Sequence, residues 1–157
     1  MTRARPHPNA LRLAARLAAV QALYQMDMGG AGVTATVQEY RDHRLGLDID
    51  GVHVGDADVP LFVALVEGVV AEQGLIDKEI SARLAEGWKL QRIDSIVRAI
   101  LRMGVYELLR RPETPVAAVI DAAVTVATGF FDGPEVAMVN AILDRVARET
   151  GAAAARA

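Results

Sequence analysis

Arginines gather at the amino-terminal end of the chain, where no acidic side chain accompanies them. The first 26 residues contain no aspartate or glutamate but four arginines: Arg3, Arg5, Arg12 and Arg16. Arg12 and Arg16 are one helical turn apart, so on a helix they would project together, while Pro6 and Pro8 keep the preceding segment extended. Clustered cations without local carboxylates can neutralise phosphates. The spacing predicts a nucleic-acid-binding ridge, with a solvated basic helix start as the alternative.

Two further polar side chains are candidates for nucleic-acid contacts. Tyr24 lies on the same helix as the arginines and could stack on a base, although its place on the apolar stripe favours core packing. Asn140 interrupts the apolar side of the last helix, so its amide either satisfies neighbouring backbone groups or faces a partner, and the structural role is favoured.

Patterns for catalysis or metal binding are missing from the sequence. The histidines are scattered, and the acidic stretch that starts at Asp48 has His53 and Val59 where a calcium loop needs glycine and glutamate. There is no cysteine, and neither Ser81 nor Ser95 lies in a nucleophile elbow. We therefore predict a binding protein with no cofactor and no metal, not an enzyme.

The elements that position these residues are predicted to be amphipathic helices. Apolar residues recur at three- and four-residue spacings, and alternating strand patterns of useful length are absent. Asn9, Asp58, Asp94 and Thr114 are the predicted helix caps, and a loop is expected from Leu45 to Val59. The expected helices cover about residues 10–28, 33–40, 60–70, 76–86, 94–110, 115–128 and 136–149. The fold class is therefore all-α, with about seven helices in a single compact domain.

Composition places the chain among ordinary soluble domains. It has 157 residues, of which 52% are hydrophobic and 24% charged, and a formal net charge of -3. This mildly acidic total argues against a general nucleic-acid coat, although a second basic zone runs over residues 83–111. No apolar run is long enough for a membrane span or a secretory signal, so a cytoplasmic location is expected. We divide the chain into a flexible basic arm (1–9), a helical domain (10–150) and a disordered tail (151–157).

Three motifs in order resemble the NusB family of bacterial transcription antitermination factors. The opening helix, Arg12-Leu-Ala-Ala-Arg16 followed by Ala19-Val-Gln-Ala-Leu-Tyr24, resembles the family's arginine-containing first helix. The segment Ala99-Ile-Leu-Arg-Met-Gly-Val-Tyr-Glu-Leu108 is similar to its central helix, and Val139-Asn-Ala-Ile-Leu-Asp144 to its final helix. The resemblance covers about residues 10–149.

This resemblance implies a NusB-like fold of two packed helical halves and a function without catalysis. The family binds the boxA element of ribosomal RNA leaders, best as a heterodimer with the ribosomal protein NusE. The complex joins NusA, NusG and RNA polymerase during ribosomal RNA transcription, and some members form homodimers. The implied RNA-binding residues are Arg5, Arg12, Arg16, Tyr24, Met138 and Asn140.

The sequence departs from the family pattern at several polar positions. Leu13 and Ala14 stand where members often carry further arginines, and Met138 replaces a common aromatic residue, which softens a stacking contact. Thr128 stands in place of a typical lysine, and Asp121-Ala122 in place of an Asn-Glu pair. We therefore expect this chain to depend more on NusE for RNA affinity than a typical member does.

Two other interpretations remain open at this point. A helical protein-interaction module would keep the fold and hold a partner without binding RNA. The amino-terminal domain of a ribosomal-RNA cytosine methyltransferase, which resembles NusB, would need a strand-rich cofactor domain that these 157 residues do not contain.

Overall fold

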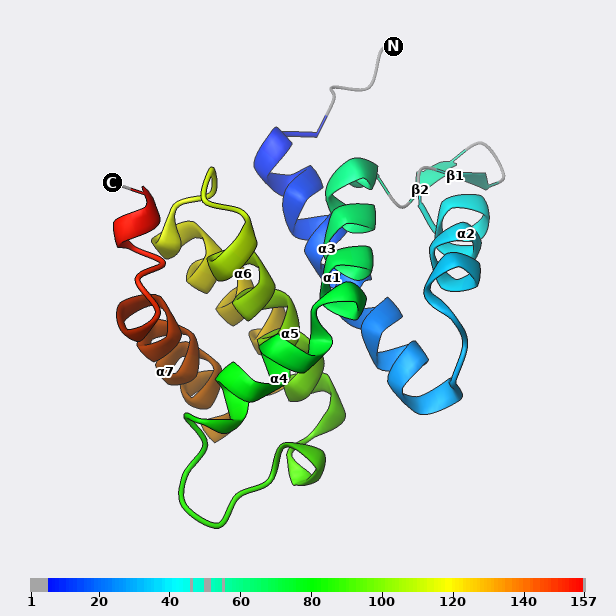
Figure 1. Ribbon diagram of the computed structural model, residues 1–157. Coiled ribbons are helices and arrows are strands. Elements are labelled where there is room, and N and C mark those ends of the chain that lie inside the picture. The colour runs from blue at the N-terminus through cyan, green and yellow to red at the C-terminus, as the bar shows by residue number, and fades with distance from the viewer. Residues whose placement is uncertain (1–5, 46, 50–51, 55, 157) are drawn as a thin grey trace.

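A computed structural model describes residues 6–45, 47–49, 52–54 and 56–156, and for residues 47–49 and 52–54 it describes the backbone alone. The longer helices confirm the all-α prediction (Figure 1). They are α1 (Pro8–Gly29), α2 (Val33–His43), α3 (Val59–Ala71), α4 (Gln73–Ser81), α5 (Ser95–Arg110), α6 (Val116–Thr128) and α7 (Pro134–Glu149). Two 3-10 turns, η1 (Leu90–Arg92) and η2 (Ala154–Arg156), complete the helical elements.

The expected loop between α2 and α3 contains a short antiparallel pairing. Strands β1 (Leu47–Ile49) and β2 (Val52–Val54) pair with Leu47 opposite Val54. Three-residue strands are too short for an alternating pattern to be recognised in the sequence. The prediction of a loop was therefore wrong for residues 47–49 and 52–54.

Helix starts follow local side-chain chemistry at two of the four predicted caps. The Asp58 carboxylate accepts from the Leu61 amide at 3.1 Å, and Asp94 accepts from the Ile96 amide at 2.8 Å, as predicted. At α1 the prediction of Asn9 was wrong, because the helix begins earlier and His7 Nδ1 accepts from the Asn9 amide at 3.1 Å. At α6 it was also wrong, because residue 115 is the cap and makes no side-chain cap hydrogen bond.

The helices form two groups that share α5, which confirms the two packed halves. Helices α1, α2 and α3 contact one another on one side, and α4, α6 and α7 pack around α5 on the other. Helix α5 also contacts α1 and α3, so it lies between the two groups (Figure 1). Its broad buried face includes Val97, Ile100, Leu101, Val105 and Leu108, as expected for a helix covered on more than one side.

Within the described ranges, no single helix is long and apolar enough to cross a bilayer. In the part of the chain that the structure describes, one bent pair, α3 with α4, reaches the required length and hydropathy, and the two helices meet at a bend of 77°.

The carboxy-terminal segment is folded onto the end of α5, so the prediction of a disordered tail was wrong for residues 151–156. Ala152 is buried, and the Arg156 guanidinium donates hydrogen bonds of 2.7 to 3.1 Å to five backbone carbonyls. These carbonyls belong to Glu107, Leu108, Arg111, Thr114 and Ala152. A cation at this position satisfies the free carbonyls of a helix end and opposes the negative end of its dipole.

We expect Arg156→Ala to lower the free energy of unfolding by about 1 to 2 kcal/mol, because the carbonyls at the end of α5 lose a charged donor. Urea denaturation followed by circular dichroism measures this change. Arg148→Ala is the control, because Arg148 is exposed on α7 and its ion pair among the described residues is with the half-exposed side chain of Asp144. An unfolding midpoint of Arg156→Ala equal to that of the control would contradict the capping role.

Candidate nucleic-acid interface

The exposed cation at the start of α1 is Arg12. Its guanidinium donates to the side-chain oxygen of Asn9, one turn earlier, and the side chain is open to solvent. Among the residues described, no carboxylate forms an ion pair with it. Arg12 is therefore exposed, and its role as a phosphate contact stays a prediction.

Arg16 does not share that exposed face, so the predicted ridge of two arginines was wrong. Its Nε and one terminal nitrogen donate to the two carboxylate oxygens of Glu107 at 2.9 and 2.8 Å. The two side chains are 8% and 1% exposed, respectively. One helical turn separates Arg12 from Arg16, but α5 packs against α1 and covers the second position. We therefore leave Arg16 out of the interface.

The predicted basic arm, residues 1–9, is shorter than expected at its carboxy-terminal end, because Pro8 and Asn9 belong to α1. Arg3 and Arg5 lie outside the described residues, which begin at Pro6.

A wide groove lies beside Arg12, between the start of α1 and the start of α6. Its volume is about 640 Å³, and its walls also include Asp58 at the start of α3 and Asp121 and Thr125 on α6. Arg111 enters the groove from the turn between α5 and α6, and its terminal nitrogen is 3.2 Å from the Glu113 carboxylate. The groove therefore carries both charge signs, with Arg12 at its exposed edge.

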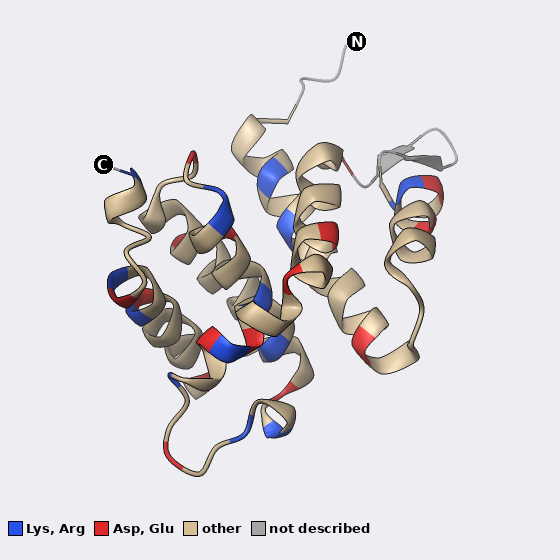
Figure 2. Ribbon diagram, viewed as in Figure 1, with Lys and Arg blue, Asp and Glu red and all other residues tan. Residues whose placement is uncertain are grey.

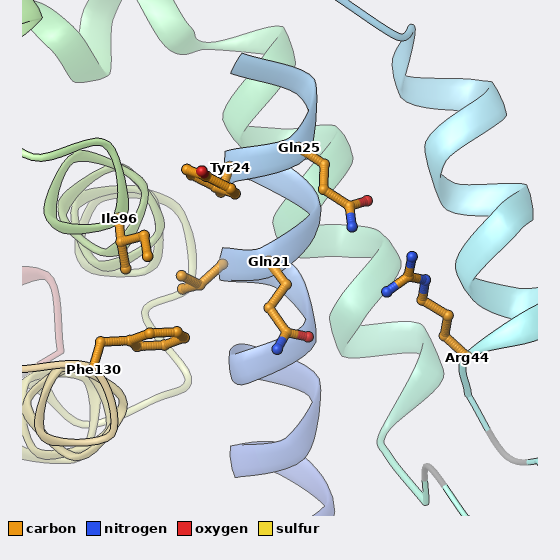
Figure 3. Close-up of a pocket in the computed structure, with 7 residues that line it drawn as sticks. Gln21, Tyr24, Gln25, Arg44, Ile96 and Phe130 are labelled. Atoms are coloured by element: carbon orange, nitrogen blue, oxygen red, sulfur yellow. The ribbon is translucent and has the colours of Figure 1, made fainter. Parts of the chain in front are cut away.

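A second hollow lies farther along α1, where Tyr24 and Phe130 present their rings. It has a volume of about 260 Å³ and is lined by Val20, Gln21, Tyr24, Gln25, Arg44, Ile96 and Phe130. Tyr24 and Phe130 are 36% and 39% exposed, so the interpretation of Tyr24 as a core residue was wrong. Figure 3 shows Tyr24, Ile96 and Phe130 on one side of α1, while Gln25 and Arg44 lie on the other side.

Alanines explain why Tyr24 stays at the surface. The buried face of α1 is made largely of small residues, among them Ala15, Ala19 and Ala22, which are fully buried. Small side chains let α3 and α5 approach the α1 backbone closely, and this turns the larger Leu17 and Tyr24 toward the edge of the contact.

The structure does not bring Met138 and Asn140 to either hollow. Both lie on α7, which packs against α4, α5 and α6. Met138 is partly buried against the core, and Asn140 is exposed. Asn140 makes no hydrogen bond to any described residue, so the structural role that its sequence position favoured was wrong.

The second basic zone consists mostly of ion pairs and not of free cations. Arg102 makes a bidentate contact with Asp77 at 2.8 and 3.0 Å, and Arg98 pairs with Asp27. Hydrogen bonds from Arg110 lower the pKa of Glu72. Acidic and basic residues are accordingly interleaved where α4 meets α5, whereas the start of α1 is basic (Figure 2). Among the described residues, the positive charge of Arg12 at the start of α1 is therefore less compensated than that of the second basic zone.

Sequence reasoning missed Phe130, Gln21, Gln25 and Arg44, and it included Arg111 only as part of the second basic zone. Phe130 follows the glycine that ends α6, and Arg44 follows the last turn of α2, so neither belongs to a helix stripe. Their role depends on meeting α1 in space. The sequence shows that Phe130 follows the end of a helix, but this position does not indicate which residues lie beside its ring.

The chain is similar to known proteins over most of its length. The model of the NusB family matches residues 13–148. The transcription antitermination protein NusB of Rhizobium etli (strain CIAT 652) is 54% identical over 138 residues, which are 88% of this chain and 86% of that protein. The NusB protein of Caulobacter vibrioides is 46% identical over 138 residues, or 88% and 93% of the two chains.

Solved structures agree with the fold. T. maritima NusB has a TM-score of 0.73 and 27% identity, covering 92% of this chain and 94% of that one. A chain in the crystal structure of antitermination factors NusB and NusE in complex with dsRNA has a TM-score of 0.74 at 22% identity, covering 89% and 98%. At that identity the second match shows the fold alone.

Proposed function

Because the chain belongs to the NusB family, we propose that it binds boxA-type leader RNA together with ribosomal protein NusE during ribosomal RNA transcription. It is a transcription antitermination factor and not an enzyme. Its further partners in this proposal are NusA, NusG and RNA polymerase, and its place of action is the bacterial cytoplasm.

One observation carries the RNA-binding part of the proposal: Arg12 is exposed at the edge of a wide groove and has no carboxylate partner in the described chain. A phosphate contact there would position the RNA without reading its sequence. Arg5, a few residues earlier in the chain, is proposed as a second contact from the arm. The exposed rings of Tyr24 and Phe130, farther along α1, add the stacking surfaces that unpaired bases use.

NusE is proposed as the partner that completes the RNA site. The structural relative solved with NusE and double-stranded RNA supports this choice through its shared fold. Burial of Arg16 removes one of the four expected cations, which makes the expected dependence on NusE stronger. The roles of Met138 and Asn140 on α7 remain part of this proposal, at a separate place from the α1 face.

We expect Arg12→Ala to weaken binding of a boxA-type single-stranded RNA and to reduce its salt dependence. One phosphate contact contributes about 0.7 to the slope of log K against log salt for single strands, and the variant should lose about that much. Fluorescence anisotropy titrations at several salt concentrations, with and without NusE, measure both quantities.

Arg148→Ala removes a cation of the same type from exposed α7 and should leave the slope unchanged. If Arg12→Ala also leaves the slope unchanged, the phosphate contact at the start of α1 is refuted. If the wild-type chain binds NusE but the pair does not bind RNA, the protein is a helical interaction module instead.

A further inference from the structure

We propose that Arg156, near the end of the chain, is a positioning residue for RNA binding: it holds the turn between α5 and α6 so that Arg111 contacts a phosphate beside Arg12. This inference rests on the proposed function, because the phosphate belongs to the same RNA strand. It goes beyond that function by assigning a second phosphate contact to Arg111. It also gives the carboxy-terminal segment a role in binding, although that segment does not itself contact the RNA.

The turn between α5 and α6 is held at both of its ends by one guanidinium. Arg111 follows the last residue of α5, and its carbonyl oxygen accepts from the Thr114 amide at 3.1 Å, which closes the turn. The Arg156 guanidinium donates to the same Arg111 carbonyl at 3.1 Å and to the Thr114 carbonyl at 2.7 Å. Hydrogen bonds from a charged donor are stronger than those between neutral groups. Arg156 therefore fixes the place of this turn.

The carboxy-terminal segment reaches the turn because the chain reverses its direction after α7. Gly151 has a φ of 77°, a conformation that glycine adopts at little cost, and the next residue, Ala152, is buried. Two further hydrogen bonds of Arg156, to the carbonyls of Glu107 and Leu108, attach the segment to the last turn of α5. The end of the chain thus lies beside the turn between α5 and α6 (Figure 1).

Arg156 acts through the turn, because none of its donors is free for a phosphate. A guanidinium has five N–H donors, and Arg156 makes five hydrogen bonds to backbone carbonyls. A residue that uses its whole donor set within the protein can orient neighbouring groups, but it has nothing left to offer a ligand.

Arg111 is the cation that this turn presents to the groove. It lines the same groove as Arg12, and its side chain is 27% exposed. Its Nε is buried and has no hydrogen-bond partner among the described residues, so only the terminal nitrogens face the groove. One of them is 3.2 Å from the Glu113 carboxylate, and this is the ion pair of Arg111 in the described structure. The protein therefore leaves most donors of this guanidinium unused.

The carboxylates of the groove leave room for a phosphate beside Arg111. The Glu113 side chain is 60% exposed, and an ion pair exposed to that extent contributes little free energy. The Asp58 carboxylate accepts from the Leu61 amide as the cap of α3, while Asp121 lies on the α6 wall. We therefore expect the phosphate between the turn and the start of α1, where it replaces Glu113 as the partner of Arg111.

The test compares the binding of a boxA-type single-stranded RNA, with NusE present, by Arg111→Ala, Arg156→Ala and the double variant. Each single variant is expected to lower the slope of log K against log salt by about 0.7, the value of one phosphate contact to a single strand. The double variant is expected to lose no more than either single variant, because both substitutions remove the same contact. Fluorescence anisotropy at several salt concentrations measures the slopes.

Matched controls separate positioning from loss of charge and from loss of stability. Arg148→Ala removes the same charge from exposed α7, and it should leave the slope unchanged. Gly68→Ala, which is destabilised where α3 meets the Tyr106 ring, should also leave the slope unchanged. Circular dichroism at the titration temperature shows whether each variant is folded.

Arg156→Lys is the second variant for the same position, in case Arg156→Ala does not fold. It keeps the charge but offers three donors where arginine has five, so it cannot bond all five carbonyls. We expect it to lose part of the slope in the wild-type background and none in the Arg111→Ala background.

Three results would overturn the inference. If Arg111→Ala keeps the wild-type slope, this arginine contacts no phosphate, although the contact at Arg12 still stands. If the folded variants of Arg156 keep the wild-type slope, Arg156 contributes to stability alone. If the losses of Arg111→Ala and Arg156→Ala add up in the double variant, Arg156 acts independently of Arg111. Absence of salt-dependent RNA binding by wild type with NusE present would instead refute the proposed function, and this inference with it.

Discussion

Glu107→Ala is expected to lower the free energy of unfolding by about 3 to 5 kcal/mol, because it leaves the Arg16 guanidinium buried without its counter-charge. In the native protein both carboxylate oxygens of Glu107 accept from Arg16, and almost no surface of either side chain reaches solvent. Urea denaturation followed by circular dichroism measures the change.

A double variant distinguishes the unpaired charge from lost packing. Arg16→Met combined with Glu107→Leu removes both charges and keeps apolar volume, so it should be much more stable than Glu107→Ala. The exposed Arg148–Asp144 pair on α7 is the matched control, and Asp144→Ala should cause no measurable loss. Equal stability of Glu107→Ala and wild type would show that the buried pair does not hold α1 against α5.

Gly68→Ala is expected to lower the free energy of unfolding by about 1 to 3 kcal/mol through overpacking. Gly68 lies on α3, and a Cβ placed there would overlap the Tyr106 ring of α5 and its hydroxyl. The ring would have to move, or α3 and α5 would have to separate. Thermal or urea unfolding measures the loss.

Gly74→Ala on α4 provides the control for this substitution. No atom outside the local chain lies within 4 Å of a Cβ at Gly74, so alanine should be neutral or slightly stabilising through its helix propensity. Combining Gly68→Ala with Tyr106→Leu should recover part of the lost stability, since the clash is with the aromatic ring. If Gly68→Ala has the same free energy of unfolding as Gly74→Ala, then α3 and α5 leave enough room for a Cβ at Gly68.

The sequence determined the features that depend on neighbouring residues. Asp58 and Asp94 cap the helices that follow them because a short carboxylate reaches amides two or three residues away. Gly30 ends α1 in the left-handed conformation, with φ of 73°, which a glycine adopts at little cost. The spacing of apolar residues likewise predicted the seven helices α1 to α7. The three motifs identified the family.

Tertiary structure decided which side chains each helix exposes. Leu13, Leu17, Val20 and Tyr24 recur at spacings of three and four residues, which predicts one apolar stripe on a helix. In the structure the neighbouring alanines allow closer packing, and Leu17 and Tyr24 lie at the edge of the contact. The Tyr24–Phe130 hollow could not be predicted either, because its two rings are far apart in sequence and come together only where the end of α6 meets α1.

The two arginines of α1 show most clearly which features the sequence determined and which the tertiary structure decided. Local sequence placed Arg12 and Arg16 one turn apart and kept carboxylates out of their surroundings along the chain. Glu107 is 91 residues away from Arg16, and only the packing of α5 on α1 brings the two charges together. Helix periodicity fixes the direction in which each side chain points from the helix axis. The whole fold decides which neighbouring helix covers a given face. It therefore also decides whether an arginine is exposed or is buried beside a carboxylate.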